Sequence, residues 1–275
     1  MPIDDKPRLS HATILVTRPR AQSAALTEQL ENAGARVVHF PVIDIAPLDL
    51  MDDGGAVRRI IEQLDSYAIA IFISSNAVIH ADRIVRDLQG DWPRRLRYAV
   101  IGPASAGALA DIGLQAEICP AEQFNSEGLL ALPAMQQVRG KQILIFRGKG
   151  GRETLAEELR RRGAHVDYAE VYQRRRPSAH LDDLPQGQRD SINAIIVASN
   201  ESLQNLYDLA GERWRTWLQT MPLVVISRRS EALAGDLGFK HIVIAKQATN
   251  EALVDAVSAC RNFLALEERD DRGSE

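Results

Sequence analysis

The chain has 275 residues with 45% hydrophobic and 25% charged side chains, a composition typical of globular proteins and unlike that of disordered or fibrous ones. At about 150 residues per domain, this length predicts two domains. The formal net charge is −4, which argues against nucleic acid or a membrane surface as a partner, so an anionic ligand would need a local basic patch.

Cysteine content and the chain's N-terminus narrow the class further. Cys119 and Cys260 are the only cysteines, and no His/Cys cluster has metal-ligand spacing, so we expect neither a disulfide nor a metal site. The N-terminal residues lack the hydrophobic segment of a secretion signal, and the longest apolar run, residues 67–73, is too short to span a membrane. We therefore expect a cytoplasmic protein with a disordered tail after Glu267.

Short β-branched segments alternate with amphipathic segments, the pattern of an α/β protein whose crossover helices cover parallel sheets. The expected strands are 14–17, 36–45, 68–74, 98–101, 115–119, 142–147, 165–172, 193–198, 223–227 and 241–245. The expected helices are 21–33, 76–88, 105–112, 152–162, 202–209, 230–237 and 250–264. Ten strands are too many for one small sheet, which again favours two domains.

An internal repeat supports this count. Segments of the two halves align at an offset of 129 and, further along, at an offset of 125. The aligned pairs include Ile14 with Ile143, Arg18 with Arg147, Gly34 with Gly163, Val37 with Val166, Ser74 with Ser199, and Gly113 with Gly238. The sequence therefore predicts a duplicated α/β unit with two similar lobes.

Residues 37–48 and 166–177 occupy equivalent places in the two copies. Each segment alternates apolar and polar residues and contains a proline near its end. We expect the pair to form a two-stranded ribbon that carries the chain between the lobes and permits them to open and close.

A glycine cluster at residues 147–152 (RGKGGR) follows an expected strand and precedes an expected helix. It is not a dinucleotide-binding motif, because Glu153 occupies the position of the third glycine. Arg147, Lys149 and Arg152 flank free backbone N–H groups there, which favours a carboxylate or phosphate ligand. A glycine turn with solvated cations is the structural alternative.

Small polar residues open helices at several expected strand ends. Singly, each is better interpreted as an N-cap than as a ligand site. Together they place many N–H groups at the carboxyl edges of two facing sheets, where open α/β folds bind ligands, so a polyanion spanning the lobes would suit them. These residues are Ser74, Ser75, Asn76, Gly102, Pro103, Ser105, Asn125, Ser126, Glu127, Ser199, Asn200, Ser227, Arg228 and Ser230.

Residues 139–176 carry eleven Lys or Arg and five Asp or Glu, a local basic surplus. Residues 160–162 fit the solvated last turn of a helix, and residues 174–176 fit either a ligand-binding surface or a solvated face of the ribbon. No catalytic triad or metal motif is present. Tyr172 lies on the expected ribbon among basic residues, as a proton donor would, although an aromatic packing residue would lie there too.

Six segments, taken together, resemble the uroporphyrinogen-III synthase family. They are VTRP (16–19), FISSNAV (72–78), VIGPASAGAL (100–109), NSEGLL (125–130), ILIFRGKGGRETLAEELRRRGAHVDYAEVYQRRRP (143–177) and VASNESLQNLYDL (197–209). The resemblance covers about residues 13–262, and segment 143–177 is its most specific part, close to the bacterial form.

The resemblance implies two flavodoxin-like parallel-sheet lobes joined by the ribbon. One lobe would comprise residues 1–43 and 176–275, and the other the continuous stretch 44–175. The repeat alone would instead suggest two consecutive lobes.

It also implies a reaction. An enzyme of this family cyclises hydroxymethylbilane to uroporphyrinogen III, with loss of water and inversion of ring D through a spiro-pyrrolenine intermediate, and uses no metal or cofactor. Tyr172 would help the hydroxyl leave. The remaining site residues would bind the substrate's acetate and propionate groups: Arg18, Arg147, Gly148, Lys149, Arg152 and the fourteen helix-opening residues named above. We expect a monomer that contacts the upstream bilane-forming deaminase transiently.

Two departures from the family pattern reduce the detail that can be carried over. The family often has Thr where this chain has Ile73 or Ala198, and residues 226–230 (ISRRS) lack the Gly-Pro found at 102–103. The principal alternative is a two-lobed, non-catalytic sensor of an anionic small molecule. A family member adapted to another role is a third interpretation.

Overall fold

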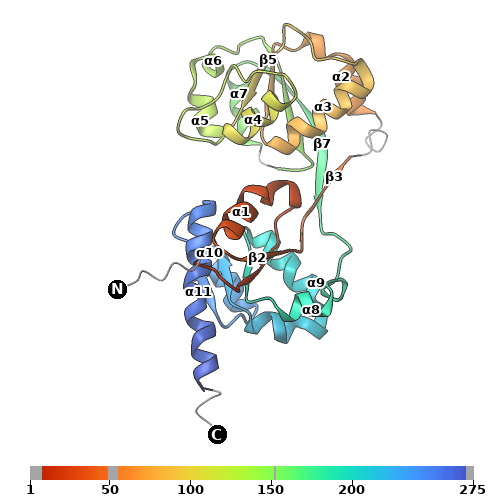
Figure 1. Ribbon diagram of the computed structural model, residues 1–275. Coiled ribbons are helices and arrows are strands. Elements are labelled where there is room, and N and C mark those ends of the chain that lie inside the picture. Colours follow the sequence, from red (N-terminus) through yellow and green to blue (C-terminus); the bar gives the residue numbers. More distant parts are fainter. Residues whose placement is uncertain (1–7, 49–54, 152, 271–275) are drawn as a thin grey trace. The chain divides into compact units, whose positions relative to one another are not determined.

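The chain folds into two compact units, each of which is an α/β structure. The computed structural model describes residues 8–48, 55–151 and 153–270, with side chains described as far as Cys260. Unit 1 comprises residues 1–44 and 175–275, and unit 2 is the continuous stretch 45–174. The chain crosses between the units on strands β3 (Asp44–Pro47) and β7 (His165–Arg175), which pair with each other (Figure 1).

Unit 1 is built on a five-stranded parallel sheet in the order β10-β9-β8-β1-β2. Numbered by their place along this unit, the strands follow the order 5-4-3-1-2, with a switch point between β1 and β8. The strands are β1 (Thr13–Val16), β2 (Arg36–His39), β8 (Ala194–Ile196), β9 (Leu223–Val225) and β10 (Ile242–Ile244). The helices are α1 (Arg20–Asn32), α8 (Gln186–Asp190), α9 (Asn200–Thr220), α10 (Arg228–Asp236) and α11 (Asn250–Asp270), with a 3-10 turn η2 (Leu181–Asp183).

Both faces of the unit 1 sheet are buried. Ile14 and Val16 point to one side and join Leu26 of α1 and Val257 of α11 in a hydrophobic core. Leu15 points to the other side, where it is fully buried as well. Burial on both faces is what a parallel sheet requires, and it explains why these strands are continuous apolar runs.

Unit 2 has its own sheet, in the order β3-β7-β6-β4-β5. Strands β7, β6, β4 and β5 pair in parallel. The added strands are β4 (Ile69–Phe72), β5 (Arg97–Val100) and β6 (Gln142–Gly148). The helices are α2 (Ala56–Glu62), α3 (Ser75–Gln89), α4 (Pro103–Asp111), α5 (Ser126–Ala131), α6 (Pro133–Gln136) and α7 (Thr154–Arg161), with a 3-10 turn η1 (Leu64–Ser66).

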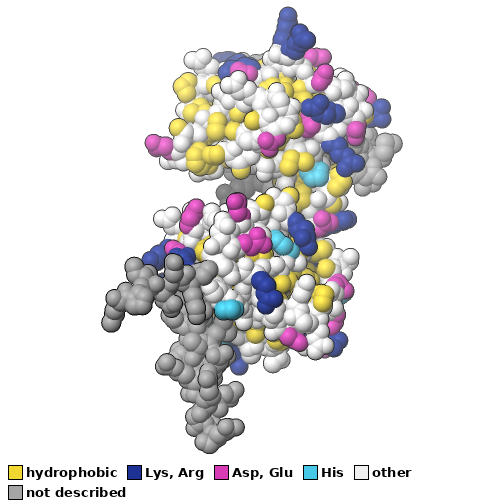
Figure 2. Space-filling model, viewed as in Figure 1, with side chains coloured by type: hydrophobic (Ala, Val, Ile, Leu, Met, Phe, Trp, Pro, Cys, Tyr) yellow, Lys and Arg dark blue, Asp and Glu magenta, His cyan; other side chains and the backbone are white. Residues whose placement is uncertain are grey.

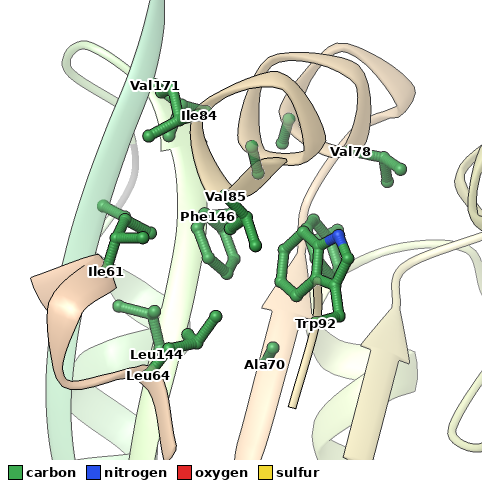
Figure 3. Close-up of a cluster of buried hydrophobic side chains, with 14 of the residues drawn as sticks. Ile61, Leu64, Ala70, Val78, Ile84, Val85, Trp92, Leu144, Phe146 and Val171 are labelled. Carbon is green, nitrogen blue, oxygen red and sulfur yellow. The ribbon is translucent and has the colours of Figure 1, made fainter. Parts of the chain in front are cut away.

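Alternation along β6 separates the two cores of unit 2. Leu144 and Phe146 point toward α3, where Phe146 stacks on Phe72 at 4.9 Å between ring centroids. Figure 3 shows this core, with Ile84 of α3 beside Val171 of β7. Ile143 and Ile145 point the other way, into a core formed with helices α5, α6 and α7. Burying each such side chain contributes about 1.5–3 kcal/mol, so β6 is fixed on both faces.

The two sheets share one strand order. This order holds for four strands of each sheet: β9, β8, β1 and β2 of unit 1 correspond to β5, β4, β6 and β7 of unit 2. The fifth strand differs, since β10 lies beside β9 in unit 1 and β3 lies beside β7 in unit 2. The corresponding strands are those that the sequence repeat aligns at offsets of about 125 and 129. The α/β class and the parallel pairing expected from the sequence are confirmed.

Two strand predictions were wrong. The expected strand 36–45 is interrupted after His39, because Pro41 has no N–H to continue a ladder, and the chain resumes as β3 at Asp44. The expected strand 115–119 is reduced to a single bridge between Ile118 and Ala99, although it lies where β10 lies in unit 1.

Helices were predicted with larger errors at their ends. The expected helix 202–209 extends from Asn200 to Thr220, continuing through a kink at Gly211, whose φ is 58°. Helix α5 begins where Asn125, Ser126 and Glu127 were expected to open a helix, whereas helices α2, α6 and α8 were not predicted. Helix α11 continues to Asp270, into the tail expected after Glu267, and residues 271–275 of that tail lie outside the described residues. No helix in the described part of the chain is long and apolar enough to cross a membrane.

Candidate active site

Tyr172 is held at the end of β7 by a break in strand pairing. Between Arg147 and Gly148 the register shifts, so that Gly148 faces Tyr172 and Arg147 faces Glu170. Adjacent residues of a regular strand point to opposite faces, whereas here Val171 and Tyr172 are both buried in the core under α3. The irregularity therefore turns the phenol toward the start of that helix.

The Tyr172 hydroxyl meets Ser74 there. The two oxygens are 3.1 Å apart, and Ser74 Oγ also accepts the N–H of Ala77 as the N-cap of α3. Ser74 can donate its own proton to the phenol oxygen while it accepts from the helix. In that arrangement the phenol O–H remains available to a ligand, although the ring is only 4% exposed.

Gly148 allows the phenol to occupy this position. A Cβ on Gly148 would lie 2.7 Å from two carbons of the Tyr172 ring, closer than packed atoms approach. The Lys149 N–H donates to the Tyr172 carbonyl at 2.7 Å, which ties the two strand ends together. A glycine at this position is therefore required by packing against Tyr172, a reason that the sequence motif did not reveal.

A pocket of about 450 Å³ opens beside the tyrosine. Its lining comes entirely from unit 2 and combines the glycine turn with two basic residues: Ile73, Gly148, Lys149, Gly150, Gly151, Tyr172 and Arg174. Backbone N–H groups, a lysine and a phenol O–H are all hydrogen-bond donors, so the pocket suits an anionic or oxygen-bearing group.

Arg147 plays a different part from the one predicted for it. Its guanidinium is paired with Glu153 at 2.9 Å and Glu170 at 3.0 Å and stacks on the Tyr168 ring. Glu170 also accepts the N–H of Gly150 at 3.1 Å. Arg147 thus braces the glycine turn through Glu170, with its charge already balanced. Arg152, predicted beside it, lies outside the described residues.

His80 is a neighbour of Tyr172 that sequence analysis missed. It lies on α3, and its ring stacks on the Tyr172 ring with centroids 5.6 Å apart and planes 26° from parallel. Burial, together with the positive charge of Arg83, lowers the pKa of His80 from its usual 6.5. Because the contact joins residues far apart in sequence, no local motif could have indicated it.

The helix-opening residues predicted in unit 2 lie where helices follow strands. Asn125 caps α5 by accepting from Gly128 at 2.8 Å, whereas Gly102 precedes α4 without a side-chain cap and is followed by Pro103. The cap side chains are thus occupied, while the first N–H groups of an α-helix have no partner within the helix. The members are Ser74, Ser75, Asn76, Gly102, Pro103, Ser105, Asn125, Ser126 and Glu127.

Phe124 adds an unpredicted apolar group to this edge. It is 51% exposed, one of few large apolar side chains in the described residues with such exposure. Its Cβ lies 3.1 Å from where a Cβ on Gly102 would be. An exposed aromatic face next to helix N-termini suits a ligand with both apolar rings and carboxylates.

Unit 1 presents a second set of helix N-termini. Ser199 caps α9 and Ser227 caps α10 through their side chains, and Ser230 joins the two helices by donating to Asn200 at 2.7 Å. The predicted residues Ser199, Asn200, Ser227, Arg228 and Ser230 are therefore brought together at the carboxyl ends of β8 and β9.

Arg18 is a partly buried cation at the carboxyl edge of the unit 1 sheet. It follows β1, and its guanidinium donates to the Asn250 side chain at 3.2 Å, at the start of α11. Burial lowers the pKa of Arg18 from its usual value. Asn250 is a neutral partner, so an anionic ligand at this position would compensate a desolvated positive charge.

Much of the local basic surplus is neutralised within the chain. Arg161 and Arg162 both pair with Glu158, Arg175 pairs with Asp44, and Arg176 pairs with Asp208. Figure 2 shows Lys and Arg side chains interspersed with Asp and Glu on the visible face of each unit. Among the described residues, no group of three or more His, Cys, Asp or Glu is placed to hold a metal ion.

Comparison with known proteins identifies the relatives of this chain. Residues 24–255 match the family model described as uroporphyrinogen-III synthase HemD. The uroporphyrinogen-III synthase of Escherichia coli K12 is 34% identical over 252 residues, covering 89% of this chain and 99% of that protein. The enzyme of the same name from Salmonella typhimurium LT2 is 34% identical over 250 residues, covering 89% and 99% respectively.

Solved structures support the fold. A crystal structure of a mutant uroporphyrinogen III synthase from Thermus thermophilus matches with a TM-score of 0.55 and 16% identity, covering 92% of this chain and 99% of that one. The uroporphyrinogen-III synthetase of Helicobacter pylori 26695 matches with a TM-score of 0.55 and 13% identity, covering 90% and 99%.

Proposed function

The chain belongs to the uroporphyrinogen-III synthase family, and from this premise we propose how its residues carry out the reaction. The enzyme is a lyase of porphyrin biosynthesis that converts hydroxymethylbilane into uroporphyrinogen III. Water leaves the linear tetrapyrrole, and the ring closes with ring D inverted. The observation that carries the proposal is the Tyr172 hydroxyl, 3.1 Å from Ser74 beside the pocket of the glycine turn.

Tyr172 acts on the leaving hydroxyl. Its phenol donates a hydrogen bond or a proton to that oxygen while Ser74 donates to the phenol oxygen. Departure of water leaves a cationic azafulvene, which attacks the substituted position of ring D to form the spiro-pyrrolenine. The intermediate then fragments and recloses. Because the bilane also closes unaided to the uninverted isomer, holding ring D in one pose matters more than acid strength.

Substrate carboxylates are bound in unit 2 by backbone donors. The proposed contacts are the N–H groups of Ser75 and Asn76, of Ala104 after Gly102 and Pro103, and of Ser126 and Glu127, with Lys149 supplying a positive charge at the glycine turn. Arg147 supports that turn through Glu170, which already accepts the Gly150 N–H. Backbone contacts predict that many single side-chain substitutions here have small effects.

Unit 1 contributes further carboxylate-binding groups. Arg18 and the N-termini of α9 and α10 are the proposed contacts, with Arg228 adding charge and Ser199, Asn200, Ser227 and Ser230 fixing the helix ends. The desolvated guanidinium of Arg18 and its neutral partner Asn250 support this assignment.

We also propose that the units are flavodoxin-like lobes derived from one duplicated ancestor, with linker strands at about 37–48 and 166–177. The shared strand order of the two sheets and the pairing of β3 with β7 support this interpretation. We propose a cytoplasmic monomer that receives the unstable bilane through transient contact with the deaminase that makes it. A purely sensory role has no comparable support, since the matched relatives are named as synthases.

Product analysis tests the proposal. Freshly made hydroxymethylbilane is incubated with the purified protein at neutral pH, and the oxidised products are separated into type I and type III isomers. We expect type III to predominate over the no-enzyme control. Type I alone, formed at the spontaneous rate by folded protein, would overturn the assignment in favour of an anion sensor.

A further inference from the structure

His80 shares the face of α3 that packs on Tyr172. The stacked rings, with centroids 5.6 Å apart, bring together a residue of the helix and one of the strand. Gly148 also contacts the phenol, and Ser74 fixes its hydroxyl. Of these contacts, only the one from His80 comes from a side chain that can change its charge near neutral pH.

We propose that His80 is a positioning residue for Tyr172, holding the phenol ring against Gly148 while the imidazole is uncharged and losing that function when the imidazole is protonated. The inference rests on the proposed role of Tyr172 and extends it to a residue that does not line the pocket of the glycine turn. In this proposal the contact between His80 and Tyr172 makes the activity depend on pH.

The surroundings of His80 explain why the neutral form is the working form. The same imidazole lines a second pocket, of about 310 Å³. Arg83 and Asp87 of helix α3 line this pocket as well. The rest of its lining includes Val171 of β7 and, at the end of β3, Pro47 and Leu48. From β7, Tyr172 faces the ring directly, and Arg174 lines the pocket of the glycine turn two residues further along.

A protonated His80 would be unfavourable for two reasons. Its positive charge would lie next to that of Arg83, which together with burial already lowers the pKa of His80. Protonation also places that charge against the phenol that assists formation of a cationic azafulvene. Since the pKa is lowered from 6.5, the neutral imidazole prevails at pH 7, and half of the imidazole is protonated only at a pH below 6.5.

Three variants separate stacking from titration. His80→Ala removes both, whereas His80→Phe keeps an aromatic ring that cannot be protonated. His165→Ala is the matched control, since His165 is an exposed residue at the start of the same strand β7. For each, kcat, KM and the type III fraction are measured from pH 5 to pH 8 after subtraction of spontaneous closure.

We expect His80→Ala to lower kcat for type III about tenfold with little change in KM, because a misplaced phenol affects chemistry more than binding. His80→Phe should retain most of the activity at pH 7 and lack the acid decline that the proposal expects of the wild type below pH 6.5. The His165 control should match the wild type throughout.

Wild-type kcat and product ratio in His80→Ala, or an unchanged acid decline in His80→Phe, would overturn the inference. If the alanine variant does not fold, the pH profile of the phenylalanine variant decides alone. Failure of the proposed function is distinct, because the wild type would then yield only type I.

Discussion

The carboxyl edges of the two sheets differ although the sheets share one strand order. In unit 2 the edge has a glycine turn, a buried tyrosine and a register shift that aims it. In unit 1 the corresponding edge has an arginine with a neutral partner and two serine-capped helices tied by Ser230 and Asn200. The unit 2 edge positions one hydroxyl, that of Tyr172, whereas the unit 1 edge carries hydrogen-bond donors that suit an anionic ligand.

The glycine contact accounts for much of this difference. Gly148 is the last residue of β6, and at the offset of 129 it aligns with Pro19, which lies just after the corresponding strand β1 and beside Arg18. A Cβ at residue 148 would overlap the Tyr172 ring, so the close approach of this ring to β6 requires a glycine at that position. Unit 1 has side chains at this point of its edge, among them the proposed ligand-binding residue Arg18. The comparison therefore predicts that substitutions at Tyr172 and Gly148 of unit 2 reduce turnover, whereas substitution of Arg18 in unit 1 weakens binding.

The strongest test of this division is Tyr172→Phe. Loss of the hydroxyl should lower kcat for type III about 10²-fold, the lower end for a residue that assists proton transfer, while the ring still packs on Gly148. Tyr98→Phe, which removes the hydroxyl of another buried tyrosine in unit 2, serves as the control and should retain kcat. A Tyr172→Phe enzyme with unchanged kcat would show that unit 2 acts by binding alone.

Gly148→Ala should give the next largest effect. The added methyl would displace the Tyr172 ring, lowering kcat about tenfold and destabilising the fold by about 1–3 kcal/mol. Kinetics and thermal unfolding measure the two effects. The matched control is Gly107→Ala on α4, where an added Cβ meets nothing within 4 Å. A fully active Gly148→Ala enzyme would mean that the ring position is not needed.

Arg18→Gln tests unit 1. Loss of one charged donor to a carboxylate, at about 1.5–3 kcal/mol, should raise KM about tenfold and leave kcat near the wild-type value. Arg213→Gln, which breaks an exposed pair with Asp182 in the same unit, should change neither constant. A fall in kcat of the Arg18→Gln enzyme without a change in KM would contradict the proposed division of turnover and binding between the two units.

Glu158→Gln should have the smallest effect and concerns stability alone. Hydrogen bonds from Arg161 and Arg162 lower the pKa of Glu158 from 4.5 to about 2. A lowered pKa means that the stabilisation is fully present above pH 4.5 and is lost as the pH falls toward 2. Thermal unfolding should therefore show a slightly lower Tm for the variant at pH 7, with the difference vanishing near pH 2. Persistence of the difference at that pH would assign it to another cause.

The sequence predicted the regular parts of both sheets because burial on two faces requires continuous apolar runs, as in residues 143–146. It failed where a single backbone feature interrupts such a run, as at Pro41. It also placed Tyr172 on a strand and expected helices to open at Ser74, Asn125, Ser199 and Ser227, whose residue types follow from capping. The contact of His80 with Tyr172 and the pairing of Arg147 with Glu170 depend on how strands register, which no local pattern encodes.

The interrupted course of unit 1 has a consequence for biosynthesis. Strands β1 and β2 leave the ribosome before unit 2, but β8, the second partner of β1, follows only after the whole of unit 2, about 180 residues after β1. At roughly 5–20 residues per second, the nascent β1 waits on the order of 9–36 s for β8. Unit 2 can complete its sheet during translation, whereas unit 1 can complete its own only after the segment that follows unit 2 has emerged.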